Sequence, residues 1–440
     1  MSFDARTDGG VHRVRPTGRP SGSVNRRECL MSSTGPAEAR IEDAGAVLVA
    51  PSALHTGDPL GDFFGTALTP EELAAGSVDL AGRTVFLAGD LSRLDGRRLR
   101  AAARVFAVRE LAQGRSADGG GPWTPVGLGR VPRRVHGLGV YYPRFFEPEA
   151  DHFGRIRAEH VFQSLTESTK PGAAHRSGIY LTPVLRDGDD LHFRLLRCST
   201  NLSGPTENFG PTDTAVVEAL NREAAALFRG HAPLNHVLAQ IYHNTPATDG
   251  RKQSKARISA HADKTKDMPA NGIMAFCTFY DGLDRLQPLT GDAFDHGVRG
   301  VSGLTRLRFR LKDEPAPGPE AAALPGRFTV TLHPGSVFFM PLSTNRRYAH
   351  EIRPSALDAE LLPTRLGYVV RCSGAEAVHA DGRTFLKTAD GPVELGPPTP
   401  DGMDELRRLY AAENRTSAVI DYGDRFRFSM NAGDYRAPRP

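Results

Sequence analysis

Five strand-like segments, separated by turn signals, dominate the second half of this 440-residue chain and restrict the folds open to it. Each is rich in β-branched or aromatic residues. They cover residues 272–280, 304–311, 327–332, 336–340 and 365–371. Many short strands in succession are typical of a barrel or a jelly roll. We therefore predict a mainly β fold with flanking helices, an α+β arrangement.

The first half of the chain has a mixed pattern. Residues 1–42 are rich in Gly, Pro, Ser and Arg without apolar periodicity, which predicts a disordered tail. An α/β extension is expected over residues 43–150, with strands at 46–50 and 83–88 and a helix at 94–111. Further expectations are a hairpin whose strands, 177–184 and 191–197, flank Asp187-Gly188, a helix opening at Thr212 and Asp213, and a helix at 403–413.

Charge, cysteine content and hydropathy restrict the partners and the compartment expected for the chain. The net charge is +4 with both signs dispersed, which is too weak to argue for a nucleic-acid partner. The four cysteines are far apart, so neither a zinc site nor a disulfide framework is indicated, and a reducing cytoplasm is expected. No apolar run approaches the roughly 20 residues of a membrane span, so no membrane partner is expected.

The stretch from Ala256 to Lys264 carries a candidate metal site. As a strand it would place His261 and Asp263 on one face, because residues i and i+2 point the same way. An identical pair, His379 and Asp381, shows that such pairs also arise by chance. Ferrous iron in oxygenases takes two histidines and one carboxylate, leaving open positions for other ligands.

The presence of a third candidate ligand separates the two HxD pairs. No histidine follows the second pair, whereas His296, His333 and His350 follow the first. Of these, His350 comes just after an apolar strand, where another barrel strand could begin. We therefore predict His261, Asp263 and His350 as the metal ligands.

Two arginines further along the chain indicate a bound dicarboxylate. Arg365 and Arg371 lie six residues apart on one predicted strand, so both guanidinium groups can face the same cavity. An arginine offers a fork of donors that fits a carboxylate with two hydrogen bonds. Two buried arginines need anionic partners, and a dicarboxylate would satisfy both.

Taken in order, these residues resemble the AlkB-type branch of the Fe(II)/2-oxoglutarate-dependent dioxygenases. The matching set is Tyr242, the His261-x-Asp263 pair, the segment from Leu332 to Gly335, His350, and Arg365 with Arg371. The resemblance covers about residues 234–373.

The resemblance implies that His261, Asp263 and His350 bind Fe(II), that Arg365 and Arg371 hold 2-oxoglutarate, and that Tyr242 offers it a hydroxyl. It also implies O2 as the oxidant. The expected fold is a double-stranded β-helix, related to cupins, over residues 151–385, with a C-terminal helix and tail at 386–440 packing on it.

Several departures from the family pattern bear on the substrate. Thr265 stands where repair enzymes carry an acidic residue, Gly367 replaces an asparagine, and residues 281–326 look like a long insertion. We therefore expect hydroxylation of a small molecule, nucleoside-like or amino-acid-like, with release of succinate and CO2. The alternatives are a nucleic-acid demethylase or hydroxylase of the same chemistry, and a cupin-like binding module without activity.

Substrate contacts are expected from outside the iron motif. The candidates are Lys264 and Thr265, just past the pair, and Asn201 and Asn208 in a polar loop. A group of basic residues would favour an anionic substrate: Lys264, Lys266, Arg251, Lys252 and Lys255.

Overall fold

A computed structural model describes residues 38–42, 45–51, 60–94, 96–114, 121–166, 173–198, 202–312 and 324–440. Most of the predicted N-terminal tail, and the substrate candidate Asn201, lie outside these residues. The end of that predicted tail is ordered as a strand: β1 (Arg40–Ile41) pairs with β13 (Phe228–Arg229).

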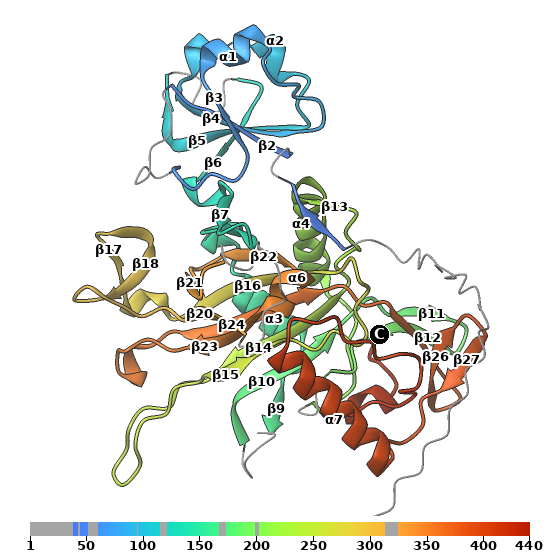
Figure 1. Cartoon of the computed structure of the whole chain (residues 1–440). Coiled ribbons are helices and arrows are strands. Elements are labelled where there is room, and N and C mark those ends of the chain that lie inside the picture. The colour runs from blue at the N-terminus through green and yellow to red at the C-terminus, as the bar shows by residue number, and fades with distance from the viewer. Residues whose placement is uncertain are drawn as a thin grey trace, which may run out of the picture. The chain divides into compact units, whose positions relative to one another are not determined.

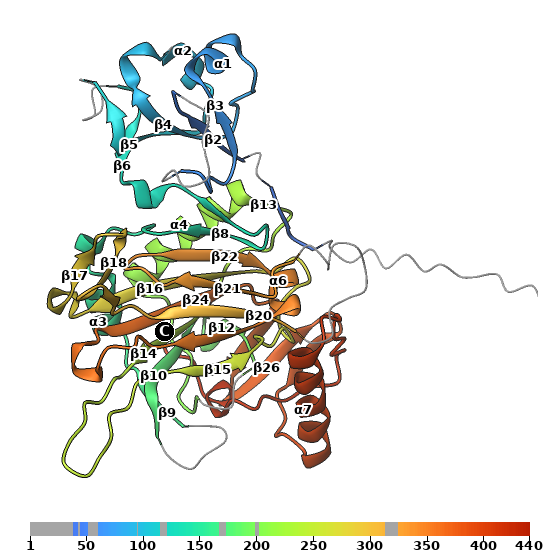
Figure 2. The same cartoon turned by 60° about the vertical axis from the view of Figure 1, so that its left-hand side comes forward.

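An eight-stranded antiparallel sheet forms the centre of the fold (Figures 1 and 2). Its strands, in spatial order, are β7 (Arg133–Val135), β8 (Gly139–Tyr142), β22 (Val337–Pro341), β16 (Ile273–Asp281), β24 (Thr364–Arg371), β14 (His236–Tyr242), β10 (Ala173–Leu181) and β9 (Gln163–Thr166). We call it the large sheet. Strands β7 and β8 belong to it although they lie within the range predicted for the α/β extension.

A four-stranded antiparallel sheet faces the large sheet. Its order is β15 (Ile258–His261), β23 (Tyr348–Arg353), β20 (Arg306–Leu311) and β21 (Arg327–Thr331), and we call it the small sheet. Strand β20 is thus part of the fold, although it lies in the range interpreted as an insertion. One apolar cluster joins the two sheets, with Phe276 and Phe338 from the large sheet and Leu307 and Phe309 from the small one. This sandwich is the predicted double-stranded β-helix, so the predicted fold class is confirmed.

Two helices cover the opposite face of the large sheet: α3 (His152–Glu159) and α4 (Pro211–Leu227). The apolar face of α4, including Val216, Leu220 and Ala224, is buried against strand residues such as Ala239. The helix begins earlier than predicted, because Pro211 occupies its first turn. The carboxylate of Asp213 accepts a hydrogen bond from the backbone of Gly210.

The N-terminal region forms a parallel sheet in the order β3 (Thr66–Leu68), β2 (Ala46–Val49), β4 (Thr84–Asp90), β5 (Arg104–Gln113) and β6 (Thr124–Val126). Two short helices, α1 (Pro70–Ala75) and α2 (Gly96–Leu99), accompany it. The predicted helix at 94–111 is therefore wrong. Val105 and Ala107 pack on one face of this sheet and Phe106 and Val108 on the other, as expected for a strand buried on both sides.

The predicted hairpin at Asp187-Gly188 exists, but one of its strands differs from the prediction. The turn joins β11 (Leu185–Asp187) to β12 (Asp190–Leu195), whereas β10 ends before it and pairs within the large sheet. The five-stranded sheet containing this hairpin continues through β25 (Ala375–Ala380), β26 (Arg383–Thr388) and β27 (Gly391–Glu394).

Other elements complete the described fold. They are a three-stranded sheet of β17 (Gln287–Leu289), β18 (Asp292–Val298) and β19 (Val301–Ser302), the helices α6 (Leu342–Arg347) and α7 (Pro400–Arg415), and the 3₁₀ turns η2 (Leu91–Arg93), η3 (Leu128–Arg130), η4 (Pro148–Ala150), η5 (Leu283–Arg285), η6 (Ala359–Leu361) and η7 (Ala432–Tyr435). No helix in the described ranges is long and apolar enough to span a membrane.

Candidate active site

A cavity of about 430 Å³ lies between the large and small sheets. Alternate residues of β24 form part of its floor: Arg365, Gly367, Val369 and Arg371 all line it. The two arginines therefore face one cavity, as the i and i+6 spacing predicts. Neighbouring strands contribute residues from the same rows, among them Gln240 and Tyr242 of β14, Thr278 of β16, and Arg176 of β10.

Three candidate ligands meet at one end of this cavity. His261 on β15 and His350 on β23 are directly opposite each other in the small sheet, with ring centroids 4.5 Å apart. Oδ1 of Asp263 lies 3.5 Å from Nε2 of His261 and 3.9 Å from Nε2 of His350. A first-row metal ion with ligand bonds of about 2.1 Å needs neighbouring donor atoms about 3 Å apart, so small movements would complete the set.

The strand that carries this pair is less regular than predicted. β15 ends at His261, and its pairing with β23 shifts register between Ile258 and His261. Asp263 therefore lies in the loop beyond the strand. Its position comes from side chains instead: Asn345 of α6 accepts a hydrogen bond from the Asp263 backbone N–H and donates one to the Asp263 carbonyl.

Each of the two histidines has a ring nitrogen that is available to a cation. Nδ1 of His261 lies 2.8 Å from the carbonyl oxygen of Ser259. A carbonyl can only accept, so Nδ1 carries a proton, and Nε2 is the ring nitrogen nearest to Asp263. Burial lowers the pKa of His350 to about 3, which keeps its ring neutral. Neither ring nitrogen of His350 forms a hydrogen bond with the described residues.

Arg371 fixes the orientation of the carboxylate. Its Nε and Nη2 donate to Oδ2 of Asp263 at 3.0 and 2.6 Å, which leaves Oδ1 facing the two imidazoles. Although burial raises the pKa of Asp263, the Arg371 guanidinium and the nearby histidines lower it far more, so the group stays ionised. Arg371 thus orients the candidate ligand, while its Nη1 is buried without a hydrogen-bond acceptor. Its contact with the co-substrate stays a prediction.

Arg365 has no anionic partner in the described structure. It is 4% exposed, and its Nε and Nη2 are buried without a hydrogen-bond acceptor. Its guanidinium carbon lies 3.8 Å from the ring centroid of Tyr242, whose hydroxyl donates to Gln240 at 3.1 Å. Gly367 makes room for it, since a Cβ there would lie 2.8 Å from Nη1 of Arg365. An unpaired buried guanidinium is costly, so this one indicates a site for an oxyanion.

Of the predicted substrate-contact residues that the structure describes, one lines the cavity and two do not. Lys264 lines the cavity, but Nζ already donates to the carbonyls of Ala262 and Tyr410. Thr265 does not line it, because its hydroxyl and N–H both bind Glu413 of α7. Asn208 also lies elsewhere: its side chain accepts from the backbone of Val184.

The other histidines and the second pair do not join the site. His379 is buried in β25 against the Thr384 hydroxyl, and His333 lies between Tyr141 and Asp292. Within the described residues one other cluster has metal-ligand composition, namely Glu159, His160 and Asp213. Both nitrogens of His160 are already bonded to carboxylates, so its polar atoms are satisfied without an ion.

Sequence reasoning missed Asn345 and Arg176. Nothing in the chain sets Asn345 apart, because it reaches Asp263 across 82 residues. Arg176 lies one residue before the predicted strand 177–184, and its i, i+4 spacing with Tyr180, which also lines the cavity, was the one available signal.

No protein-family model matches this sequence, and no curated protein matches it. Among solved structures, the chain is similar to a prolyl-4-hydroxylase from Pseudomonas putida, at 12% identity over 52% of this chain and 91% of that one, with a TM-score of 0.27. It is similar to OsALKBH1, at 12% identity over 53% and 97%, with a TM-score of 0.29. A third is the non-heme alpha ketoglutarate dependent epimerase SnoN from nogalamycin biosynthesis, at 16% identity over 60% and 91%, with a TM-score of 0.27. These names span a hydroxylase, an ALKBH protein and an epimerase, so the comparisons do not single out the AlkB-type branch.

Proposed function

We propose that this chain is an Fe(II)/2-oxoglutarate-dependent dioxygenase that hydroxylates a C–H bond of a small molecule. One observation carries the proposal. Within a single cavity, the donor atoms of His261, Asp263 and His350 all lie within 4.8 Å of one another, and the buried, unpaired Arg365 lines the same cavity.

The donor set fits ferrous iron. Two imidazoles and one carboxylate oxygen would form a three-ligand face that leaves positions for other ligands. Because Arg371 occupies Oδ2 of Asp263, the carboxylate offers a single oxygen to the ion. The carboxylate also argues against a halogenase, in which that ligand is normally missing so that halide can bind.

The cavity also fits 2-oxoglutarate, a dicarboxylate. Arg365 would bind the carboxylate remote from the metal through the guanidinium atoms that now lack an acceptor. The ring of Tyr242 holds that guanidinium in place, and the hydroxyls of Tyr242 and Thr278 are the neighbouring polar groups on the cavity floor.

Bound iron and 2-oxoglutarate would supply oxidation by O2, with release of succinate and CO2. The chain would orient the reactants and exclude water. The side chains of Phe276, Leu307 and Ile352 line the cavity beside the ligands, which gives the metal end an apolar wall. The ion pair between Arg371 and Asp263 keeps the carboxylate from rotating away from the imidazoles.

Thr265 bears on the choice between a small molecule and nucleic acid. This position is acidic in the repair enzymes that the sequence resembles. Here its hydroxyl and N–H are committed to Glu413, so it is not free to contact a base. This observation favours a small-molecule substrate over a nucleic-acid demethylase.

The test is anaerobic addition of Fe(II) and 2-oxoglutarate to the full chain, monitored by the visible charge-transfer band. The wild type should form the band, and His261→Ala and His350→Ala should lose it. His379→Ala, in the second HxD pair, is the matched control and should keep it. Arg365→Gln should bind Fe(II) normally but need much more 2-oxoglutarate.

Each rival predicts a different result. If both ligand variants keep the band at full strength, the ligand assignment is wrong. A binding module without activity would release no succinate from 2-oxoglutarate when O2 is admitted. A nucleic-acid enzyme would bind oligonucleotides with a steep dependence on salt concentration.

A further inference from the structure

We infer that the substrate carries an oxyanion, a carboxylate or a phosphate, and that Arg176 and Arg257 bind it at the opening of the cavity. This inference rests on the proposed function, because it assigns a ligand to the positive charge of the cavity that remains unpaired when the metal and co-substrate are bound.

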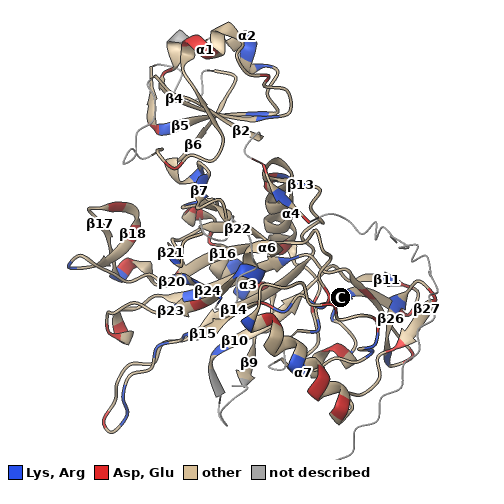
Figure 3. Cartoon of the chain, in the orientation of Figure 1, with Lys and Arg blue, Asp and Glu red and all other residues tan. Residues whose placement is uncertain are grey.

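The charges lining the cavity are strongly unbalanced. Its cationic side chains are Arg176, Arg257, Lys264, Arg365 and Arg371, whereas Asp263 is the single carboxylate among the described residues that line it. Elsewhere the two signs are interspersed along the described chain, as Figure 3 shows. A divalent ion together with a doubly charged co-substrate adds no net charge. The excess of positive charge therefore remains in the loaded site.

Three of the five cations have partners, either in the structure or in the proposed complex. Arg371 is paired with Asp263, and Nζ of Lys264 donates to two carbonyls and lies 5.5 Å from the ring centroid of Tyr410. Arg365 is assigned to the co-substrate. Within the described residues, Arg176 and Arg257 form neither a hydrogen bond nor an ion pair.

Arg176 is separated from the co-substrate position by Tyr242. In the large sheet, Tyr242 pairs with Arg176 on one side and with Arg365 on the other. Neighbouring strands lie about 4.8 Å apart, so the two arginine backbones are about 10 Å apart. Because the Tyr242 ring packs on Arg365, it divides the floor into two cationic positions. One anion would occupy each.

Arg257 approaches the same opening from the small sheet. It directly precedes β15, and the preceding loop is tied to β10 by a 2.9 Å contact between the Ser254 hydroxyl and Nε2 of His175, the neighbour of Arg176. Arg257 is exposed and Arg176 is partly buried, whereas Arg365 is 4% exposed. This gradient places Arg176 and Arg257 nearer the opening and Arg365 deeper inside.

The basic residues highlighted by the sequence have other roles. Nζ of Lys266 is paired with Asp267, and Nζ of Lys255 donates to the carbonyls of Ser355 and Leu357. Arg251 and Lys252 are exposed on the loop before β15 and do not line the cavity. The sequence thus predicted an anionic substrate, but the residues now assigned to its recognition are different.

Titration calorimetry can test the inference without knowledge of the substrate. The probes are phenyl phosphate, benzoate and the neutral benzyl alcohol, added anaerobically to the full chain loaded with Fe(II) and 2-oxoglutarate. We expect at least one of the two anions to bind and the alcohol not to bind. Comparison of the two anions shows whether the site prefers phosphate or carboxylate. Arg176→Gln and Arg257→Gln should each weaken anion binding at least tenfold and leave the charge-transfer band unchanged.

The control is Arg186→Gln, which removes an exposed arginine of β11 outside the cavity and should change nothing. The inference is overturned if neither anion binds, if binding survives both substitutions, or if the anion competes with 2-oxoglutarate. An oligonucleotide that binds far more tightly through the same arginines would overturn the small-molecule assignment.

The inference and the proposed function can fail separately. If the charge-transfer band never forms, the proposed function fails. Phenyl phosphate binding to the metal-free chain, lost in Arg176→Gln and Arg257→Gln, would then still support the oxyanion site. If the band forms and the substitutions leave anion binding intact, the inference alone fails.

Discussion

At the residue scale, the position of Asp263 depends on side chains from two distant helices. Asn345 of α6 binds the N–H and the carbonyl of Asp263 at 2.9 and 2.8 Å, and is itself fully buried. Asn414 of α7 accepts from the N–H of Ala262, and Glu413 accepts from the N–H of Thr265. These contacts take the place of a strand ladder, which ends at His261. Asn345 is therefore a positioning residue for the proposed metal ligand.

We predict that Asn345→Ala weakens Fe(II) binding by about 10- to 100-fold, as expected when a group that orients a metal ligand is removed. The free energy of unfolding should also fall by about 1–3 kcal/mol, because buried backbone groups lose their partners. Metal titration and urea unfolding would measure the two effects.

Asn221→Ala is a matched control for this prediction. Asn221 also forms two hydrogen bonds to one backbone unit, Leu234, at 2.8 and 2.9 Å, but it lies outside the cavity. It should lose similar stability and keep its metal affinity. Equal metal affinity in both variants would show that Asn345 has only a structural role.

The sequence correctly grouped side chains in one cavity where they belong to an ordered pattern, while their roles stay predictions. His350 could be selected over His296 and His333 because it follows a strand that must pair within the barrel, and Arg365 follows from strand periodicity. The partner of Arg371 could not be predicted in this way. The ion pair between Arg371 and Asp263 depends on the distance between two sheets, which is set by packing and leaves no local pattern in the sequence.

At the element scale, the strands of the core were predictable, and so were two strands of the N-terminal region: the segments 46–50 and 83–88 are β2 and β4. The helix predicted between residues 94 and 111 was wrong. The segments 336–340 and 365–371 combine apolar or β-branched residues with clear turn signals, and both are strands of the large sheet. By contrast, residues 94–111 satisfy a helical apolar spacing and also contain the run Val105 to Val108. Pairing with β4 and β6 decides between these two patterns, and that pairing is tertiary.

One polar cluster joins two elements and should respond to pH. His160, at the end of α3, lies 3.1 Å from Glu207 and 2.6 Å from Asp213 near the start of α4. Burial lowers the pKa of His160, but hydrogen bonds and charge attraction from these two carboxylates outweigh it and raise the pKa to about 9. The protonated form is therefore the one that stabilises the fold.

Because the folded pKa lies above the unfolded value of about 6.5, this stabilisation is complete below that pH and is lost as the pH rises through 9. We predict that the wild type loses about 3 kcal/mol more stability than His160→Gln between pH 6 and pH 10. Urea unfolding at several pH values would show the difference. Parallel pH profiles for the two proteins would contradict the assignment. His379→Gln, at a buried histidine without a carboxylate partner, should follow the wild type.

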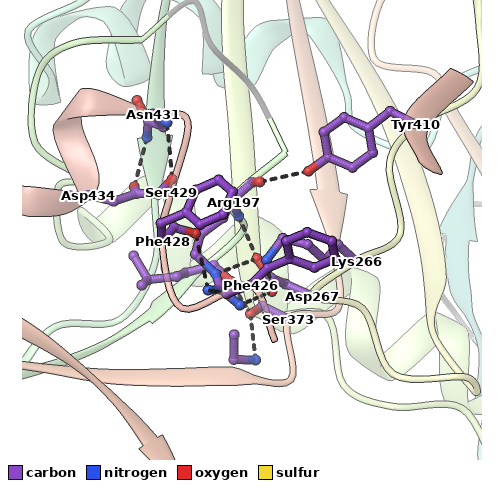
Figure 4. Close-up of polar contacts among 12 residues, drawn as sticks. Arg197, Lys266, Asp267, Ser373, Tyr410, Phe426, Phe428, Ser429, Asn431 and Asp434 are labelled. Atoms are coloured by element: carbon purple, nitrogen blue, oxygen red, sulfur yellow. Dashed lines mark hydrogen bonds and ion pairs between the residues drawn. The ribbon is translucent and has the colours of Figure 1, made fainter. Parts of the chain in front are cut away.

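At the scale of the whole molecule, the C-terminal segment is attached to the core by hydrogen bonds from a buried arginine, and the N-terminal sheet by a buried ion-pair cluster. Figure 4 shows the C-terminal attachment. Arg197 binds Asp267 through Nε and Nη2 and donates to the carbonyls of Phe426 and Phe428. Tyr410 of α7 donates to the carbonyl of Arg197. The C-terminal helix therefore packs near the loop that carries Asp263.

The N-terminal sheet is attached through Glu223 of α4. Its carboxylate accepts from Arg104 of β5 at 2.8 Å, from Arg130 of η3 at 3.2 Å and from the hydroxyl of Tyr142 of β8 at 2.7 Å. Burial alone would raise the pKa of Glu223, but the two guanidinium groups outweigh it and lower the pKa. The ionised form is the stabilising one, so this contribution is present above the unfolded pKa and is lost on acidification.

We predict that Glu223→Ala lowers the free energy of unfolding at pH 7 by about 3–5 kcal/mol, because it leaves two arginines and a buried phenol without their acceptor. The matched control is Glu218→Ala on the same helix, where the carboxylate is exposed and pairs with Arg222 at 3.7 Å. That pair is worth less than about 1 kcal/mol.

Since Glu223 is the common acceptor for β5, η3 and β8, its removal should also separate unfolding of the N-terminal sheet from that of the core. Hydrogen exchange would then show strands β2 to β6 losing protection before the large sheet, whereas a single cooperative transition in Glu223→Ala would show that other contacts couple the two sheets.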